Sequence, residues 1–168
     1  MFYHLRASQV SRRLKEGRTL DLGCGKEILQ GAVGVELKRF HKPKSLSIPV
    51  DSLNSLPFTG GSFDTVCLMA ALNYVPEVDR GYLAKEIHRV LSKYGRLVLT
   101  CVRRLPIWHP HGLDASEVRC VFESNHFRLI YDKPFMLGLN RIYVFGREEI
   151  RTDSLVAIQK VIREEIHL

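Results

Sequence analysis

The sequence lacks a long hydrophobic run and a signal for export. No apolar stretch in the 168 residues approaches the roughly 20 residues that a helix needs to cross a bilayer. The first residues, MFYHLRASQVSRRLKEG, lack the apolar centre of a signal peptide. Internal repeats and low-complexity tracts are also absent. We therefore expect a cytoplasmic protein whose residues 1–168 form one domain.

Cysteine is scarce and scattered. The four cysteines, Cys24, Cys67, Cys101 and Cys120, form no CxxC pair, whereas a zinc site needs clustered ligands. In a cytosolic chain such residues are expected to behave as small hydrophobes, most of them buried. The sequence therefore predicts no metal site.

Charge of both signs is present, with an excess of positive charge. Hydrophobic residues make up 45% of the chain and charged residues 26%, which is typical of a globular protein. The formal net charge is +7, and basic residues gather in the N-terminal segment and in the loop KRFHKPK. A solvated surface is the simpler interpretation of these clusters. The basic balance still favours an anionic substrate.

Short apolar strands alternate with amphipathic helices along the chain. We expect strands over 18–23, 32–37, 45–50, 63–70, 96–102, 127–132 and 140–147, and helices over 4–16, 79–91, 114–125 and 152–166. This alternation predicts an α/β protein, a Rossmann-like three-layer sandwich with a mostly parallel sheet between helices. Ligands of such sheets bind outside the carboxyl ends of the strands, where the motifs below are expected to lie.

The segment LDLGCGKEILQGAVGVELK, residues 20–38, places a glycine loop between two strands. Gly23 and Gly25 permit a sharp turn and a close approach to a ligand. A dinucleotide site also requires a third glycine and a long helix whose N-terminus faces the phosphates. Here Glu27 stands near the third position, and only a short connection leads to Glu36. The sequence therefore argues against a dinucleotide, and the absence of GxxxxGK[ST] excludes a P-loop.

A ligand without phosphates fits the same loop better. S-adenosylmethionine carries an amine, a carboxylate, a sulfonium, a ribose and an adenine. Asp21 is placed to attract the amine, directly or through water, and the main chain at Gly23 and Gly25 can contact the methionine part. Glu36, at the tip of the second strand, can accept hydrogen bonds from both ribose hydroxyls, because a carboxylate has two acceptor oxygens. No long helix is needed for such a ligand.

Several blocks of sequence, in order, resemble the class I S-adenosylmethionine-dependent methyltransferases. These blocks are LDLGCG, GVE, LPFTGGSFDTV and HRVLSKYGRLVLT, within roughly residues 18 to 102. The closest similarity is to the small-molecule branch that includes the ubiquinone/menaquinone-type enzymes. The resemblance implies a seven-stranded sheet with an antiparallel last strand. It also implies S-adenosylmethionine as cofactor and S-adenosylhomocysteine as product.

The resemblance also implies which residues bind the cofactor. They are Asp21, Gly23, Cys24, Gly25, Glu36, Leu37, Asp51, Ser52, Leu53, Leu68 and Met69. The loop positions would hold the methionine part, and the end of the second strand would hold the ribose and one adenine face. The positions after the third strand would contact the adenine, and the pair ending the fourth strand would lie near the reacting sulfur. No catalytic residue is assigned.

These features predict direct methyl transfer to a small-molecule acceptor. A good leaving group and a well-placed acceptor can supply much of the rate without a dedicated base. His109 and His111, in PIWHPHG, are the residues that could act as a base, although loop histidines usually have other roles.

Three further readings stay open. A nucleic acid is the less favoured acceptor and would use the basic loop at 38–44. A non-catalytic member of the fold would bind the cofactor without turnover. A homo-oligomer could cover the edge left by the shortened helix.

Overall fold

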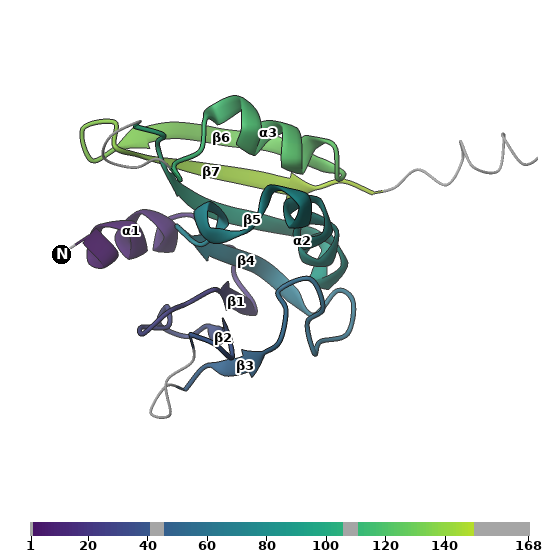
Figure 1. Cartoon of the computed structure of the whole chain (residues 1–168). Helices are drawn as coiled ribbons and strands as arrows, with labels where there is room; N and C mark the ends of the chain where they lie inside the picture. The colour runs from purple at the N-terminus through teal and green to yellow at the C-terminus, as the bar shows by residue number, and fades with distance from the viewer. Residues whose placement is uncertain (1, 41–45, 106–110, 150–168) are drawn as a thin grey trace, which may run out of the picture.

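A seven-stranded sheet runs through the protein (Figure 1). The computed structural model of the chain describes residues 2–40, 46–105 and 111–149. The strands are β1 Thr19–Leu22, β2 Val33–Leu37, β3 Ile48–Val50, β4 Phe63–Met69, β5 Leu91–Val102, β6 Phe127–Phe135 and β7 Asn140–Arg147. Their order in the sheet is β3-β2-β1-β4-β5-β7-β6, and β7 runs antiparallel to both of its neighbours. This confirms the expected sheet, including its antiparallel last strand.

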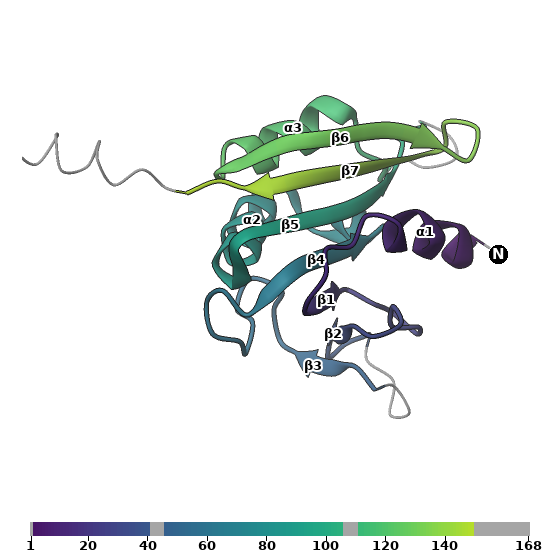
Figure 2. The same ribbon diagram turned by 180° about the vertical axis from the view of Figure 1, so that it is seen from behind.

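Helices lie on both faces of the sheet. They are α1 Phe2–Ser11, α2 Glu77–Val90 and α3 Ala115–Glu123, with a 3-10 turn, η1, at Leu72–Tyr74. Helices α2 and α3 cover one face and α1 the other, as the two opposite views show (Figures 1 and 2). None of the helices in the described ranges has the length and apolarity needed to cross a membrane. The helix expected over 152–166 lies outside the described residues.

The central strands send alternate side chains to the two faces, as the two-residue period of a strand requires. Val66 and Leu68 of β4 belong to the main core, which packs beneath α2 and α3. Cys67, between them, belongs to a smaller cluster on the other face with Val10 of α1 and Leu29. Both clusters are almost fully removed from solvent, so the sheet is buried on each side near its middle.

The connection from β1 to β2 contains no helix. Residues 23–32 form a series of turns, as the short spacing in the sequence predicts. Leu29 is only 4% exposed, and its main-chain N–H donates a 2.8 Å hydrogen bond to Oδ2 of Asp21. Leu29 therefore covers part of the sheet face that a crossover helix would otherwise cover.

Several element boundaries differ from those expected. Strand β5 begins at Leu91 rather than at 96, because the chain becomes extended there (φ −71°, ψ 140°) and pairs with Phe63. Helix α1 ends at Ser11, well before residue 16. Helix α3 begins after Asp114, as expected, and the N–H of Asp114 donates to Oε2 of Glu117 at 2.8 Å. These shifts leave the strand order and the predicted ligand edge unchanged.

Candidate cofactor site

Two adjoining cavities lie at the carboxyl ends of β1, β2 and β4, where the strand order reverses direction between β1 and β4. The glycine-loop cavity, of about 430 Å³, is lined by the glycine loop, the end of β2 and the end of β4. The outer cavity, of about 390 Å³, is lined by the segment after β3 and the start of α2. Leu37, Leu53 and Tyr74 line both, so the two cavities form one continuous cleft. This is the position at which open α/β sheets bind ligands.

The two glycines of the loop have different structural roles. Both have positive φ angles, +70° at Gly23 and +66° at Gly25, which residues other than glycine rarely adopt. A Cβ atom at Gly23 would lie 2.7 Å from the Cβ of Ala71, so the loop must pass close to η1 there. A Cβ at Gly25 would meet no atom within 4 Å. Gly23 therefore allows the loop to pack, and Gly25 leaves open space beside the cavity.

Glu36 ties the end of β2 to the glycine loop. Its Oε2 accepts a 2.7 Å hydrogen bond from the N–H of Gly25, and its Oε1 accepts one of 2.7 Å from the N–H of Leu37. The side chain is 6% exposed and lines the glycine-loop cavity. Each carboxylate oxygen keeps a further acceptor position. Glu36 is therefore held in a fixed position and can accept hydrogen bonds from hydroxyl groups of a ligand.

Asp21 lies beneath the same loop and is fully buried. Its Oδ2 accepts the N–H of Leu29, whereas Oδ1 has no hydrogen-bond partner among the described residues. Burial raises the pKa of Asp21 to about 6, and the nearby carboxylate of Glu36 adds to this shift, while the N–H of Leu29 opposes it. A cationic group placed here would relieve an unsatisfied acceptor and favour the ionised carboxylate.

The outer cavity brings together the residues that follow β2 and β3. Asp51 and Ser52 line it, and Asp51 forms a 2.7 Å ion pair with Lys38. Both partners are largely exposed, so this pair contributes little to stability. The hydroxyl of Ser52 accepts a hydrogen bond from the N–H of Asn54 at 3.1 Å, which fixes the turn after Asp51.

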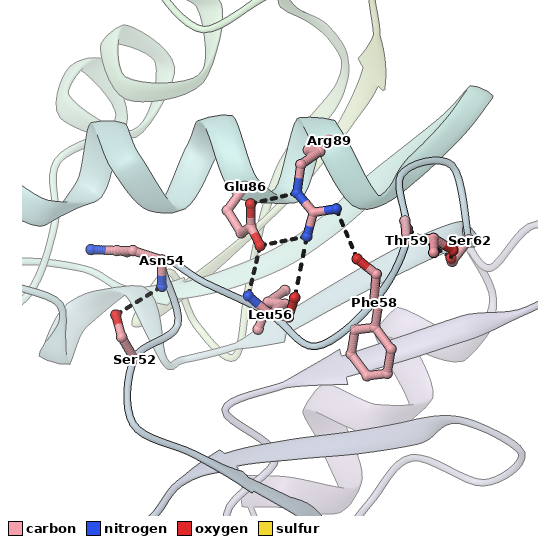
Figure 3. Close-up of polar contacts among 8 residues, drawn as sticks. All are labelled: Ser52, Asn54, Leu56, Phe58, Thr59, Ser62, Glu86 and Arg89. Atoms are coloured by element: carbon pink, nitrogen blue, oxygen red, sulfur yellow. Dashed lines mark hydrogen bonds and ion pairs between the residues drawn. The ribbon is translucent and has the colours of Figure 1, made fainter.

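Helix α2 holds the chain that follows this turn. Figure 3 shows the guanidinium of Arg89 between Glu86 and two loop carbonyls, donating to Phe58 O at 2.8 Å and Leu56 O at 3.3 Å. Glu86 in turn accepts the N–H of Leu56 at 2.6 Å and two hydrogen bonds from Arg89. These bonds to Arg89 lower the pKa of Glu86. The pair therefore anchors the segment that supplies one wall of the cleft.

The expected site residues do not all reach the cleft. Those that line one of the cavities are Gly23, Gly25, Glu36, Leu37, Asp51, Ser52, Leu53 and Met69. Asp21 and Leu68 are fully buried and line neither cavity, and Leu68 belongs to the main core. Cys24 is 6% exposed and also lies outside both linings, and burial raises the pKa of its thiol to about 11. Cys24 is therefore a packing residue within the loop rather than a nucleophile.

Residues that were not predicted complete the cleft. The glycine-loop cavity is also lined by Arg6 of α1, by Arg39, and by Ala70, Ala71, Tyr74 and Val75. Ala70 has a φ of 56°, and its N–H donates to Thr100 O at 2.8 Å. Such strained positions cluster at functional sites. Arg39 belongs to the basic loop and Arg6 to the basic N-terminal segment, but the sequence does not indicate that both reach the cavity.

The cleft offers few groups for acid–base chemistry. Of the described residues that line the glycine-loop cavity, none is histidine or cysteine. His111 is exposed, and its carbonyl accepts a hydrogen bond from Asn73 at 3.0 Å, while His109 lies outside the described residues. Within the described ranges no group of three His, Cys, Asp or Glu side chains could hold a metal ion. The arrangement is suited to binding and positioning rather than to general-base catalysis.

Comparison with known proteins agrees with this geometry. Residues 28–99 match the sequence pattern of a family described as "Methyltransferase domain". This match covers less than half of the chain and is a resemblance to that family. The matched span begins after Gly25, within the loop, and ends within β5, so it includes Glu36 and Met69 but not Asp21. No curated protein with a matching sequence was found.

Solved structures of methyltransferases share the fold of this chain. An S-adenosylmethionine-dependent methyltransferase from Methanosarcina mazei is 18% identical with a TM-score of 0.66, and the match covers 84% of this chain and 98% of that one. One from Thermotoga maritima, described as a possible histamine N-methyltransferase, is 18% identical with a TM-score of 0.70, covering 87% and 89%. The 1,6-didemethyltoxoflavin-N1-methyltransferase of Burkholderia thailandensis, solved with S-adenosylhomocysteine, is 14% identical with a TM-score of 0.65, covering 86% and 77%.

At these identities the likeness to solved structures is one of fold. The domain match and this fold together support an S-adenosylmethionine-dependent methyltransferase with S-adenosylmethionine as its cofactor. The chemistry of the acceptor is not contained in either comparison.

Proposed function

We propose that residues 1–168, acting as one domain, transfer the methyl group of S-adenosylmethionine to a small, anionic acceptor. The observation that carries this proposal is the pair of 2.7 Å hydrogen bonds that fix Glu36 between Gly25 and Leu37. They hold an acceptor-only side chain at the end of β2, facing the cleft. Such a group suits a ribose with two free hydroxyls and repels a pyrophosphate.

The residues of the cleft fit the proposed cofactor. Asp21 lies outside both cavity linings, beneath the glycine loop, and its buried oxygen without a partner among the described residues would attract the cationic amine of the methionine part. Gly25 leaves open space where a ligand can approach the main chain. Leu37 and Leu53 give the shared part of the cleft apolar walls that would suit the adenine ring. Asp51 stands in the outer cavity, where it would accept from the adenine amino group.

The chain's contribution to the reaction is to bind and orient. When bound, the cofactor supplies a methyl group attached to a good leaving group. Met69 and Ala70 line the cavity at the end of β4, where they would limit how the two reactants can lie. Holding the reactants in line can supply much of the rate, which agrees with the lack of histidine and cysteine in the described lining.

A small anionic acceptor is favoured by the charges around the glycine-loop cavity. Among the described residues, Arg6 and Arg39 line this cavity together with one carboxylate, Glu36. Both oxygens of Glu36 already accept main-chain N–H groups, so the two arginines remain available to an anionic ligand. The ubiquinone/menaquinone-type branch, which the motifs resemble, methylates small molecules. The four cysteines are free thiols, including the exposed Cys120, which is typical of the reducing cytoplasm where we place the reaction.

A labelled-methyl assay tests the proposal. The protein is incubated with S-adenosylmethionine carrying a labelled methyl group and with matched anionic and neutral small molecules. We expect labelled product from anionic acceptors, inhibition by S-adenosylhomocysteine, and no inhibition by NAD. Glu36→Ala, prepared identically, controls for contaminating enzymes and should lose the activity. Tight cofactor binding without transfer to any acceptor class would instead identify a non-catalytic member of the fold.

Nucleic acid is the second candidate acceptor. Lys38 and Arg39 both line the outer cavity, at the start of the basic loop. If this surface bound phosphates, affinity for RNA or DNA would fall steeply as salt rises. Labelled transfer to RNA with such a salt dependence would replace the small-molecule proposal.

A further inference from the structure

Arg6 brings a positive charge from α1 into the glycine-loop cavity. The side chain is half-buried, and no carboxylate of the described residues forms an ion pair with it. Its Nε donates a 3.1 Å hydrogen bond to Oδ1 of Asn140. The two terminal nitrogens have no protein partner within the described ranges. Arg6 thus presents donors that no anionic side chain in the described part of the chain receives.

Asn140 fixes the direction of this guanidinium. It is 3% exposed and stands at the first position of β7, opposite Val102 at the end of β5. Its side-chain N–H donates to the sulfur of Met136 at 3.5 Å, which leaves the amide oxygen for Arg6. A buried asparagine that makes both bonds has a defined orientation. The guanidinium of Arg6 is therefore anchored to Asn140 through Nε, which leaves its two terminal nitrogens available to a ligand.

The position of this anchor separates Arg6 from the ribose end of the cleft. Glu36 lies at the end of β2, whereas Asn140 lies on β7, and β1, β4 and β5 run between these two strands. Tyr74, on the rim, faces Arg6 closely enough that its phenol opposes the lowering of the Arg6 pKa by burial. An arginine remains charged under these conditions. The anchored guanidinium of Arg6 thus lines the cavity from the side of β7, whereas Glu36 lines it from β2.

We propose that Arg6, held by Asn140, binds a carboxylate or phosphate group of the acceptor and so selects anionic acceptors. This inference rests on the proposed function and names the residue that gives the acceptor its charge. A bound anion would form charge-assisted, bidentate hydrogen bonds with the free donors of Arg6. The carboxylate of the cofactor's methionine part has the same chemistry and is the second possible source of the anion.

Ligand-observed NMR on protein saturated with S-adenosylhomocysteine tests this, with benzoate as the anionic probe and benzamide as its neutral counterpart. We expect benzoate to bind the wild-type protein about tenfold more tightly or better than it binds Arg6→Gln, with benzamide weak on both. Asn140→Asp keeps the size of the side chain and supplies a carboxylate that neutralises Arg6, so it should also lose benzoate. Arg12→Gln, a matched change at an exposed arginine, should behave as wild type.

The outcomes are distinguishable. Equal benzoate affinity in wild type and Arg6→Gln, or no benzoate binding by wild type, would overturn the inference. If Arg6→Gln lowers the affinity for S-adenosylhomocysteine but not for methylthioadenosine, which lacks the carboxylate, Arg6 binds the carboxylate of the cofactor instead. Failure of wild type to bind S-adenosylhomocysteine would refute the proposed function, and the benzoate titration on the protein alone would still test Arg6. Thermal unfolding of each variant shows whether it is folded.

Discussion

The main-chain N–H of Gly25 donates a 2.7 Å hydrogen bond to Oε2 of Glu36, eleven residues further along the chain. This bond joins the glycine loop directly to the end of the neighbouring strand. In a longer βαβ unit a helix would support the loop, but here residues 23–32 form only turns. Two hydrogen bonds therefore support the loop in place of the helix. One joins the N–H of Gly25 to Glu36, and the other joins the N–H of Leu29 to Asp21.

Cofactor affinity should fall as the pH is lowered from about 7 to about 5. The reason is that Asp21, whose pKa burial raises to about 6, becomes protonated and no longer attracts the cofactor's amine. Calorimetric titration with S-adenosylhomocysteine across this range measures the effect. Asp21→Asn should bind weakly throughout and lack this pH dependence. Identical pH profiles for the two proteins would show that Asp21 does not contact the amine.

The same carboxyl group should make the free protein less stable as the pH rises. An unfolded aspartate has a pKa of about 3.9, and the folded pKa of Asp21 is about 6, so the folded state binds more protons between these values. Its stabilising contribution is complete below about pH 4 and is lost as the pH rises through 6, by on the order of 2–3 kcal/mol. Denaturant unfolding should show a flatter dependence in this window for Asp21→Asn. A parallel dependence would contradict the raised pKa.

Alanine at the two loop glycines should have different effects. Gly23→Ala adds a methyl group 2.7 Å from Ala71 as well as backbone strain, and it should destabilise the protein by about 2–4 kcal/mol. The methyl group of Gly25→Ala meets no neighbour, so the variant should lose only about 1–2 kcal/mol of stability through backbone strain. It should also lower the affinity for the cofactor, because the methyl group occupies open space beside the cavity. Chemical unfolding and calorimetry separate the two effects. Equal destabilisation would show that the contact with Ala71 is unimportant.

Much of the fold follows from the sequence because buried strands have local signatures. The apolar runs predicted every described strand, and the spacing of Gly25 and Glu36 predicted both the missing helix and the acidic strand end. The sequence did not show which of Leu68 and Met69, at the end of β4, faces the cleft. Neighbouring residues of a strand face opposite sides, and the sequence does not give the register. The structure places Met69 at the cleft and Leu68 in the core.

The basic N-terminal segment includes Arg6, but its place in the site was missed because its partner is distant in the sequence. Its side chain meets Asn140, 134 residues further along the chain, and no local pattern encodes that contact. The extended start of β5 was missed for a similar reason, since Leu91 pairs with Phe63 of the neighbouring strand. Contacts of this kind depend on tertiary packing rather than on propensity.

Loss of the anchor on α2 should loosen one wall of the cleft. Glu86→Gln removes the charge that binds Arg89 and the N–H of Leu56, and it should cost about 1–3 kcal/mol of stability. We also expect faster amide hydrogen exchange at Leu56 and weaker cofactor binding. Lys93→Met, which breaks the exposed pair with Glu149, is the control and should change neither property. Exchange that is unchanged in Glu86→Gln would contradict the anchoring role.

Calorimetric titration of the purified protein with S-adenosylmethionine and S-adenosylhomocysteine, with Glu36→Ala alongside, tests the central claim most directly. The alanine variant removes the acceptor for the ribose and the bond to Gly25, so we expect micromolar binding by wild type and about tenfold or more weaker binding by the variant. Circular dichroism establishes that both proteins are folded. Absence of heat with either ligand in folded wild-type protein, or equal affinity in Glu36→Ala, would contradict the proposed cofactor site.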